Sequence, residues 1–180
     1  MLIYLADLGH NLLTLSSDVY PLGVGNLAAY LKAFFRPADG LDIRIFREPQ
    51  DLKAALDLRA PDILGLSNYA WNENISLHAA RYAKLRHPRT FTLMGGPNFP
   101  LTPGEQEAFL RSAPVKGVID AYVNGPTYEG ERAFLNVVRR FDEGGRTVEG
   151  FMEGAVPGGL FIHPRSDAFT VGGEVPRIED

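Results

Sequence analysis

Short apolar segments that alternate with helical segments are the feature that most constrains the fold of this chain. Five of them predict buried strands, at residues 2–6, 42–46, 62–68, 90–94 and 117–125. Helices are predicted after them, at residues 26–35, 49–60, 75–87, 104–112 and 130–144. The strand segments are nearly continuous apolar runs, which is typical of parallel strands covered by helices on both faces. Right-handed crossovers then predict an α/β fold with a flavodoxin-like, doubly wound sheet of five parallel strands in the order 2-1-3-4-5.

The last part of the chain has a different pattern. Residues 159–163 and 168–172 are short strand-like segments on either side of Pro-Arg-Ser-Asp, which predicts a hairpin. We therefore expect a Rossmann-type domain over residues 1–145, followed by a hairpin and connector over residues 146–180.

Composition excludes several classes of function. The chain has no cysteine, so it cannot supply a disulfide, a thiol nucleophile or the ligands of an iron–sulfur cluster. Its net charge of −4 argues against a nucleic-acid partner, which would favour a basic face. It has neither a signal peptide nor an apolar run of roughly 18 residues that could span a membrane, so a cytoplasmic protein without a membrane partner is expected.

In a doubly wound sheet, ligands bind beyond the carboxyl ends of the strands. The loops expected there are rich in glycine, proline, asparagine and aromatic residues. Five aromatic side chains are predicted to surround a broad apolar opening suited to a bulky planar ligand, Tyr20, Tyr69, Trp71, Phe99 and Tyr128. Core packing or contacts between domains is the alternative for each of them.

Signals for catalysis or for a phosphate site are weak. Gly23 and Gly25 precede a helix, but Ala28 stands where a dinucleotide motif would have its third glycine. Of the four histidines, only His10 is expected at the ligand edge, and Asp7 ends the first strand. No residue is therefore assigned as catalytic or as a metal ligand, and this chain alone is not expected to be an enzyme.

Four segments together resemble a known family. They are Tyr-Pro-Leu-Gly-Val-Gly and the helix after it (20–32), Ala-Pro-Asp to Trp-Asn (60–72), Thr-Phe-Thr-Leu-Met-Gly-Gly-Pro-Asn-Phe-Pro (90–100) and residues 120–138. In this order and spacing the chain resembles the cobalamin-binding-like N-terminal domain of radical SAM enzymes of the class B methyltransferase type. The resemblance covers nearly the whole chain.

The resemblance implies which residues contact a cofactor. By position, Ser67 and the pair Gly95 and Gly96 match the residues that line the slot for the nucleotide tail of cobalamin. The whole set expected to contact cofactor is Asp7, His10, Pro21, Gly23, Ser67, Tyr69, Trp71, Asn72, Gly95, Gly96, Pro97, Asn98 and Gly125. His10 follows Asp7 by three residues rather than by the two found in cobalt-ligating carriers, so His10 is not expected to ligate cobalt.

The function implied by the resemblance is a cobalamin-binding module, which holds the cofactor for methyl transfer by a radical SAM domain that follows in the parent protein. SAM and a 4Fe-4S cluster would belong only to that catalytic half, whose cysteine motif this chain lacks. Two alternatives stay open. One is a structural or interaction domain that has lost cobalamin binding, and the other is a flavodoxin-like binder of another small cofactor.

Overall fold

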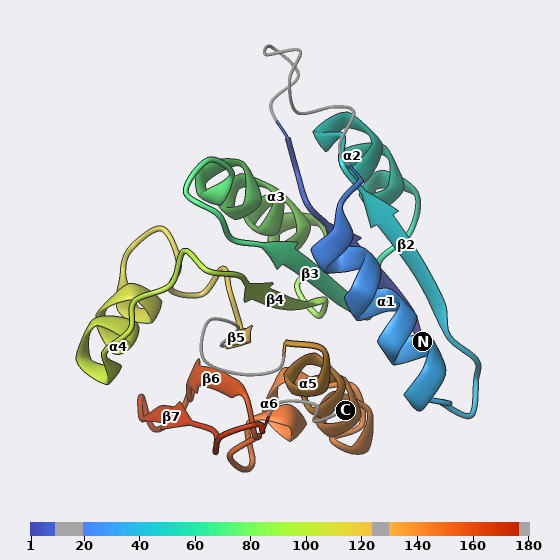
Figure 1. Ribbon diagram of the computed structural model, residues 1–180. Helices are drawn as coiled ribbons and strands as arrows, with labels where there is room; N and C mark the ends of the chain where they lie inside the picture. The colour runs from blue at the N-terminus through green and yellow to red at the C-terminus, as the bar shows by residue number, and fades with distance from the viewer. Residues whose placement is uncertain (10–19, 124–129, 177–180) are drawn as a thin grey trace.

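A computed structural model describes residues 1–9, 20–123 and 130–176 of the chain. Its centre is one sheet of seven strands in the order β2-β1-β3-β4-β5-β6-β7, with helices on both faces (Figure 1). The strands are β1 (Leu2–Ala6), β2 (Asp42–Phe46), β3 (Ile63–Ser67), β4 (Phe91–Gly95), β5 (Ala121–Val123), β6 (Gly159–Ile162) and β7 (Phe169–Val171). The helices are α1 (Leu22–Phe34), α2 (Pro49–Leu58), α3 (Glu73–Arg86), α4 (Pro103–Arg111), α5 (Gly130–Glu143) and α6 (Val148–Phe151).

The first five strands are parallel and have the predicted order 2-1-3-4-5. The sheet as a whole has seven strands, because the predicted C-terminal hairpin joins the five parallel strands at the edge of β5. β6 pairs antiparallel with β5, where Tyr122 lies opposite Leu160, and β7 pairs antiparallel with β6. The open edge of β5 and the buried apolar side chains of β6 explain this addition. The boundary at residue 145 between a Rossmann-type domain and a connector stays a prediction.

Two predicted elements begin four residues away from the start that the structure gives them. β5 begins at Ala121 rather than at residue 117, because residues 115–119 form turns in which the amides of Val118 and Ile119 donate to the carbonyl of Val115. α1 begins at Leu22 rather than at residue 26, so that Gly23 and Gly25 lie in its first turn. Because α1 starts earlier, these two glycines lie at the carboxyl edge of the sheet, where they leave the helix backbone uncovered by side chains.

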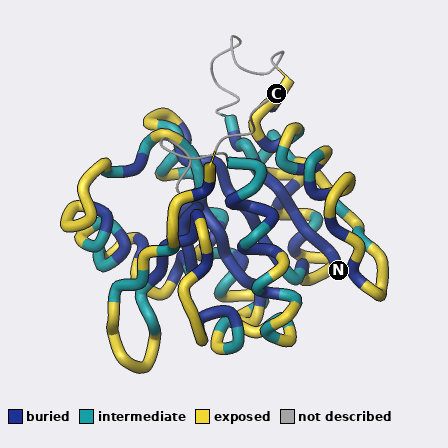
Figure 2. The backbone as a smooth tube through the Cα atoms, turned by 60° about the horizontal axis from the view of Figure 1, so that its bottom comes forward, coloured by how far each residue is buried: buried dark blue, intermediate teal, exposed yellow. Residues whose placement is uncertain are grey.

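Alternate residues of each strand enter two separate cores, one on each face of the sheet. Ile3 and Leu5 of β1 pack under α1, α5 and α6, whereas Tyr4 and Ala6 pack on the face that carries α2 and α3. The central strands are buried along their length (Figure 2). Truncating one such leucine to alanine typically costs about 2–5 kcal/mol of stability, so these strands hold the carboxyl edge rigidly. Within the described ranges, no helix is both long and apolar enough to cross a bilayer.

Candidate ligand cavity

Two glycines leave a hollow in the sheet face beneath α1 and α5. Gly65 lies between Leu5 and Leu93 in the register of β1, β3 and β4. One row nearer the carboxyl edge, Gly95 lies between Ser67 and Val123. Gly65 therefore has a leucine on each side, and Gly95 has a serine on one side and a valine on the other.

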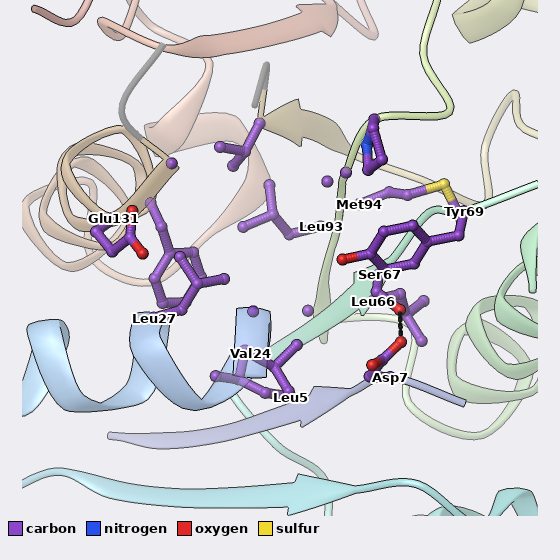
Figure 3. A pocket seen from close by; sticks show the side chains of 18 residues that line it. Leu5, Asp7, Val24, Leu27, Leu66, Ser67, Tyr69, Leu93, Met94 and Glu131 are labelled. Atoms are coloured by element: carbon purple, nitrogen blue, oxygen red, sulfur yellow. Dashed lines mark hydrogen bonds between the residues drawn. The ribbon is translucent and has the colours of Figure 1, made fainter. Parts of the chain in front are cut away.

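Helices α1 and α5 cover this hollow and enclose a cavity of about 530 Å³ (Figure 3). Gly23, Val24 and Leu27 contribute from α1, and Gly130, Glu131 and Phe134 from α5. The strands and the loops after them contribute Leu5, Asp7, Gly65, Leu66, Ser67, Tyr69, Leu93, Met94, Gly95, Gly96, Pro97 and Val123. The volume lies within the range of roughly 300–1,000 Å³ that is usual for sites of small organic molecules.

Asp7, Ser67 and Asn72 form a hydrogen-bonded group at one end of the cavity. The Ser67 hydroxyl donates to Oδ1 of Asp7 over 2.6 Å, as Figure 3 shows. The Asn72 amide donates to Oγ of Ser67 (2.8 Å) and to Oδ1 of Asp7 (3.2 Å). Asn72 is the N-cap residue of α3, but its side-chain oxygen accepts from the backbone amide of Tyr69, not from the helix. This buried amide therefore holds the Asp7 carboxylate and the Ser67 hydroxyl at the cavity wall.

Tyr69 forms the side of the cavity next to that group. Its ring stacks on Trp71 with centroids 4.5 Å apart and planes 7° apart. Trp71 itself is 65% exposed and does not line the cavity. Burial, together with the charge of Asp7, raises the pKa of the Tyr69 phenol, so its hydroxyl stays protonated near neutral pH. Tyr69 can therefore donate a hydrogen bond to a ligand in the cavity.

The neighbouring glycines Gly95 and Gly96 have different reasons to be glycine. A Cβ added to Gly95 would lie 3.4 Å or more from every neighbouring atom, so it would fit the backbone and project into the cavity wall. Gly96 has a φ of +135°, and an added Cβ would lie 2.5 Å from the carbonyl oxygen of Asn68. The lack of a side chain at Gly95 makes room in the cavity. The lack of a side chain at Gly96 permits the turn of the backbone.

A second polar network fixes that turn from behind. The Asn68 amide donates to the carbonyl of Asn98 (2.7 Å) and to the Tyr122 hydroxyl (3.1 Å), and Tyr122 donates to the carbonyl of Gly96 (2.9 Å). The Asn98 amide donates to Glu73 at the start of α3. The loop after β4 is thus tied to the loop after β3.

Seven of the predicted cofactor-contacting residues line the cavity: Asp7, Gly23, Ser67, Tyr69, Gly95, Gly96 and Pro97. Asn72, Trp71 and Asn98 lie beside it and contact its wall or its loops through the interactions above. Pro21 is the buried N-cap residue of α1. His10 and Gly125 lie outside the described residues, and so does Tyr128.

The prediction that Phe99 faces the opening is wrong. Its ring is buried on the opposite face of the sheet, stacked on Tyr122 with centroids 3.7 Å apart. The reason is the pairing of Asn98 with Asn68, because it turns the chain after Pro97 toward α4.

Sequence reasoning missed most of the apolar lining, Leu5, Val24, Leu27, Leu66, Leu93, Met94, Val123 and Phe134, and also Gly65, Gly130 and Glu131. Gly65 did carry a signal, because a glycine within an apolar strand marks a close approach or a missing contact. The leucines and valines gave no such signal, because their sequence pattern is that of ordinary core residues. Within the described part of the chain, no group of three or more His, Asp or Glu side chains could hold a metal ion.

Fold and cavity together define a doubly wound domain with a cavity at the carboxyl edge of its sheet. No protein-family model matches the chain. It is 37% identical over 123 residues to 2-(S-pantetheinyl)-carbapenam-3-carboxylate methyltransferase of Streptantibioticus cattleyicolor. It is 33% identical over 123 residues to the cobalamin-dependent radical SAM methyltransferase TokK of Streptomyces tokunonensis. Each match covers 66% of this chain and 16% of the relative.

The solved structures give the same result at the level of the fold. OxsB, a cobalamin-dependent S-adenosylmethionine radical enzyme solved with aqua-cobalamin and S-adenosylmethionine bound, matches with a TM-score of 0.64 and 16% identity. The match covers 99% of this chain and 22% of OxsB. The predicted resemblance to part of the cobalamin-dependent radical SAM enzymes is thereby confirmed.

Proposed function

We propose that this chain is a cobalamin-binding module and that the cavity between the sheet and helices α1 and α5 receives the nucleotide tail of the cofactor. The observation that carries the proposal is the glycine-floored cavity at the carboxyl edge, in a chain whose relatives include a cobalamin-dependent enzyme. Side chains at Gly65 and Gly95 would fill the place that a ligand needs. The residues present therefore fit such a tail.

Each part of the cavity has a distinct task in this proposal. Ser67, held by Asp7 and Asn72, and the protonated Tyr69 hydroxyl supply polar contacts that orient the ligand. Gly95 lets the ligand approach the backbone, and the apolar side chains exclude water around it. Bound cobalamin would supply the methyl-transfer chemistry, and this chain's own contribution is to bind and orient it.

The chain spans 16% of the length of the curated relatives that it matches, so the activity of the whole protein is itself a proposal. We place the module beside a radical SAM domain that binds SAM and a 4Fe-4S cluster and that transfers the methyl group to substrate. The complete absence of cysteine agrees with a cluster held elsewhere. We further propose that the protein works in the cytoplasm.

Titration of the 180-residue chain with hydroxocobalamin tests the function directly. We expect a shift in the visible absorption of the cofactor and co-elution with the protein on gel filtration. Trp71 gives a second readout, because this single tryptophan stacks on the cavity residue Tyr69 and a bound corrinoid would quench its fluorescence. N-acetyltryptophanamide at equal absorbance controls for light absorbed by free cofactor.

Three outcomes separate this function from its alternatives. Absence of a spectral shift, of co-elution and of quenching at excess cofactor would contradict cobalamin binding. If FMN or a nucleotide then bound instead, the flavodoxin-like alternative would replace it. If none of these ligands bound, the result would favour the hypothesis that the chain is a structural or interaction domain.

A further inference from the structure

One edge of the sheet is open in the described part of the chain. β2 is the outermost strand on that side, and among the described residues it pairs only with β1 (Figure 1). The amide of Asp42 donates to the carbonyl of Met1 over 2.9 Å and therefore points toward β1. Because backbone groups alternate in direction along a strand, Ile43 and Ile45 direct their N–H and C=O groups away from β1. β2 thus offers backbone donors and acceptors to another strand.

The side chains of this edge strand differ between its two faces. On the face that carries α1, Ile43 packs at the margin of the core and Ile45 is 38% exposed. On the other face, Asp42 and Arg44 are half-exposed, and Nη2 of Arg44 lies 3.4 Å from Oδ2 of Asp42. Charges on an edge strand usually discourage pairing with another chain. Here the two charges have opposite signs and lie two residues apart, so the strand is complementary in charge to an antiparallel copy of itself.

The backbone directions and the charges together select one register for such a pair. Ile43 and Ile45 carry the outward groups, so hydrogen-bonded pairs must join residues of this set. A pair of strands centred on Asp42 or on Arg44 would place like charges opposite each other, and one centred on Ile45 would match neither charge with its opposite. With Ile43 opposite Ile43 of the second copy, Asp42 lies opposite Arg44 on both sides of the centre, and Ile45 lies opposite Leu41.

From this match we propose that the chain forms a dimer with twofold symmetry, in which the β2 strands of two copies pair antiparallel about Ile43. The pairing satisfies the outward backbone groups, adds two Asp42–Arg44 pairs and joins the apolar side chains of the two strands on one face. All residues of β2 are described and none lines the cavity, so the inference is independent of the proposed function. A single strand pair makes a small interface, for which we expect a dissociation constant of about 1–100 μM.

Sedimentation of the 180-residue chain at low ionic strength, from about 1 μM to about 1 mM, measures this association. We expect the parent to change from monomer to dimer across the range. Arg44→Asp and Asp42→Arg should each weaken self-association at least tenfold, because each places like charges opposite each other. The two variants mixed in equal amounts should associate like the parent, because every pair between them then has opposite charges.

These measurements also define the results that would overturn the proposal. A parent that stays monomeric over the whole range would do so, and so would variants that self-associate as strongly as the parent. A mixture of the two variants that stays monomeric would equally contradict the pairing of Asp42 with Arg44. Circular dichroism and urea unfolding show whether each variant keeps its fold, which is expected because both side chains are half-exposed.

Single cysteines test the register, because the chain has no cysteine of its own. In the proposed dimer the two Cα atoms of residue 43 lie roughly 5.5 Å apart, within the reach of a disulfide. Ile43→Cys should therefore form a covalent dimer on mild oxidation. Ile45→Cys is the matched control, because its two Cα atoms lie about 14 Å apart in this register, which is beyond that reach. Cross-linking of neither variant, of both alike or of Ile45→Cys alone would overturn the assignment.

Discussion

The hydroxyl of Ser67 donates to Oδ1 of Asp7 over 2.6 Å, which joins the last residue of β3 to the residue that directly follows β1. Asn72, at the start of α3, donates to both of them. Three separate segments of the chain thus meet at one end of the cavity. The direct hydrogen bond to the carboxylate fixes the orientation of the serine hydroxyl.

Asn72→Ala should therefore destabilise the fold and loosen this end of the cavity. The substitution leaves the amide of Tyr69 without its acceptor and removes a donor from both Ser67 and Asp7. We expect the free energy of unfolding in urea to fall by about 1–3 kcal/mol, as is usual when buried partners lose a hydrogen bond. Asn26→Ala, at an exposed position of α1, is the control and should change stability by about 0.5 kcal/mol or less. Equal effects of the two substitutions would show that the network adds nothing to stability.

Gly95→Val should block the cavity while the domain stays folded. A Cβ at this position would lie 3.4 Å from the carbonyl oxygen of Val123, an ordinary contact, and the two methyl groups would extend into the cavity. We expect the affinity for hydroxocobalamin to fall at least tenfold, about 1.4 kcal/mol of binding free energy. Gly104→Val, in the first turn of α4 with nothing within 4 Å of the added Cβ, should bind like the parent. A Gly95→Val protein that binds cobalamin as well as the parent would disprove the placement of the nucleotide tail.

Gly96→Ala and Gly95→Ala should affect stability very differently although the two residues are adjacent. Gly96 combines a φ of +135° with only 2.5 Å between an added Cβ and the carbonyl oxygen of Asn68, so alanine there is strained and crowded. We expect Gly96→Ala to cost about 1–3 kcal/mol in thermal or urea unfolding. Gly95→Ala should lie within about 1 kcal/mol of the parent, because β4 accepts a Cβ at that position. Similar losses for both variants would contradict the distinction between a turn glycine and a cavity glycine.

Asp39 should make stability depend on pH in the acid range. The Arg146 guanidinium donates to both of its carboxylate oxygens, each over 2.6 Å, and holds the pKa of Asp39 well below its usual range. A carboxyl group whose pKa is lowered by folding stabilises the native state above its ordinary pKa of about 4, and that stabilisation is lost as the pH falls. The stability advantage of the parent over Asp39→Asn should therefore be constant near neutral pH and shrink below about pH 4.

Urea unfolding between pH 7 and pH 3 at low ionic strength measures this difference. High salt should reduce it, because the pair is partly exposed and its charges are screened. Glu153→Gln removes a charge from an exposed carboxylate for which no ion pair is described, and its effect should not change with pH in the same way. A parent–variant difference for Asp39→Asn that grows on acidification would reverse the sign and refute the assignment.

The arrangement of strands and helices could be predicted from local pattern. Runs such as Leu2–Ala6 and Phe91–Gly95 are apolar along their length because both sheet faces are covered, and the helices between them require parallel crossovers. The ligand edge followed from the same rule, which is why Asp7, Ser67 and Gly95 could be expected near one another. The likeness to cobalamin-dependent radical SAM enzymes also followed from the order and spacing of short motifs.

The amino-acid sequence alone therefore determined the parallel five-strand order, the edge of the sheet at which the cavity lies and the absence of cysteine ligands. Tertiary structure alone decided that β6 and β7 extend the sheet, that Phe99 turns away from the opening, and that Leu27 and Phe134 line a cavity. The physical reason is that periodicity reports whether a side chain is buried, but not which distant residue lies against it. Whether a glycine opens space or permits a turn depends on what lies opposite it, as Val123 lies beside Gly95 and Asn68 against Gly96.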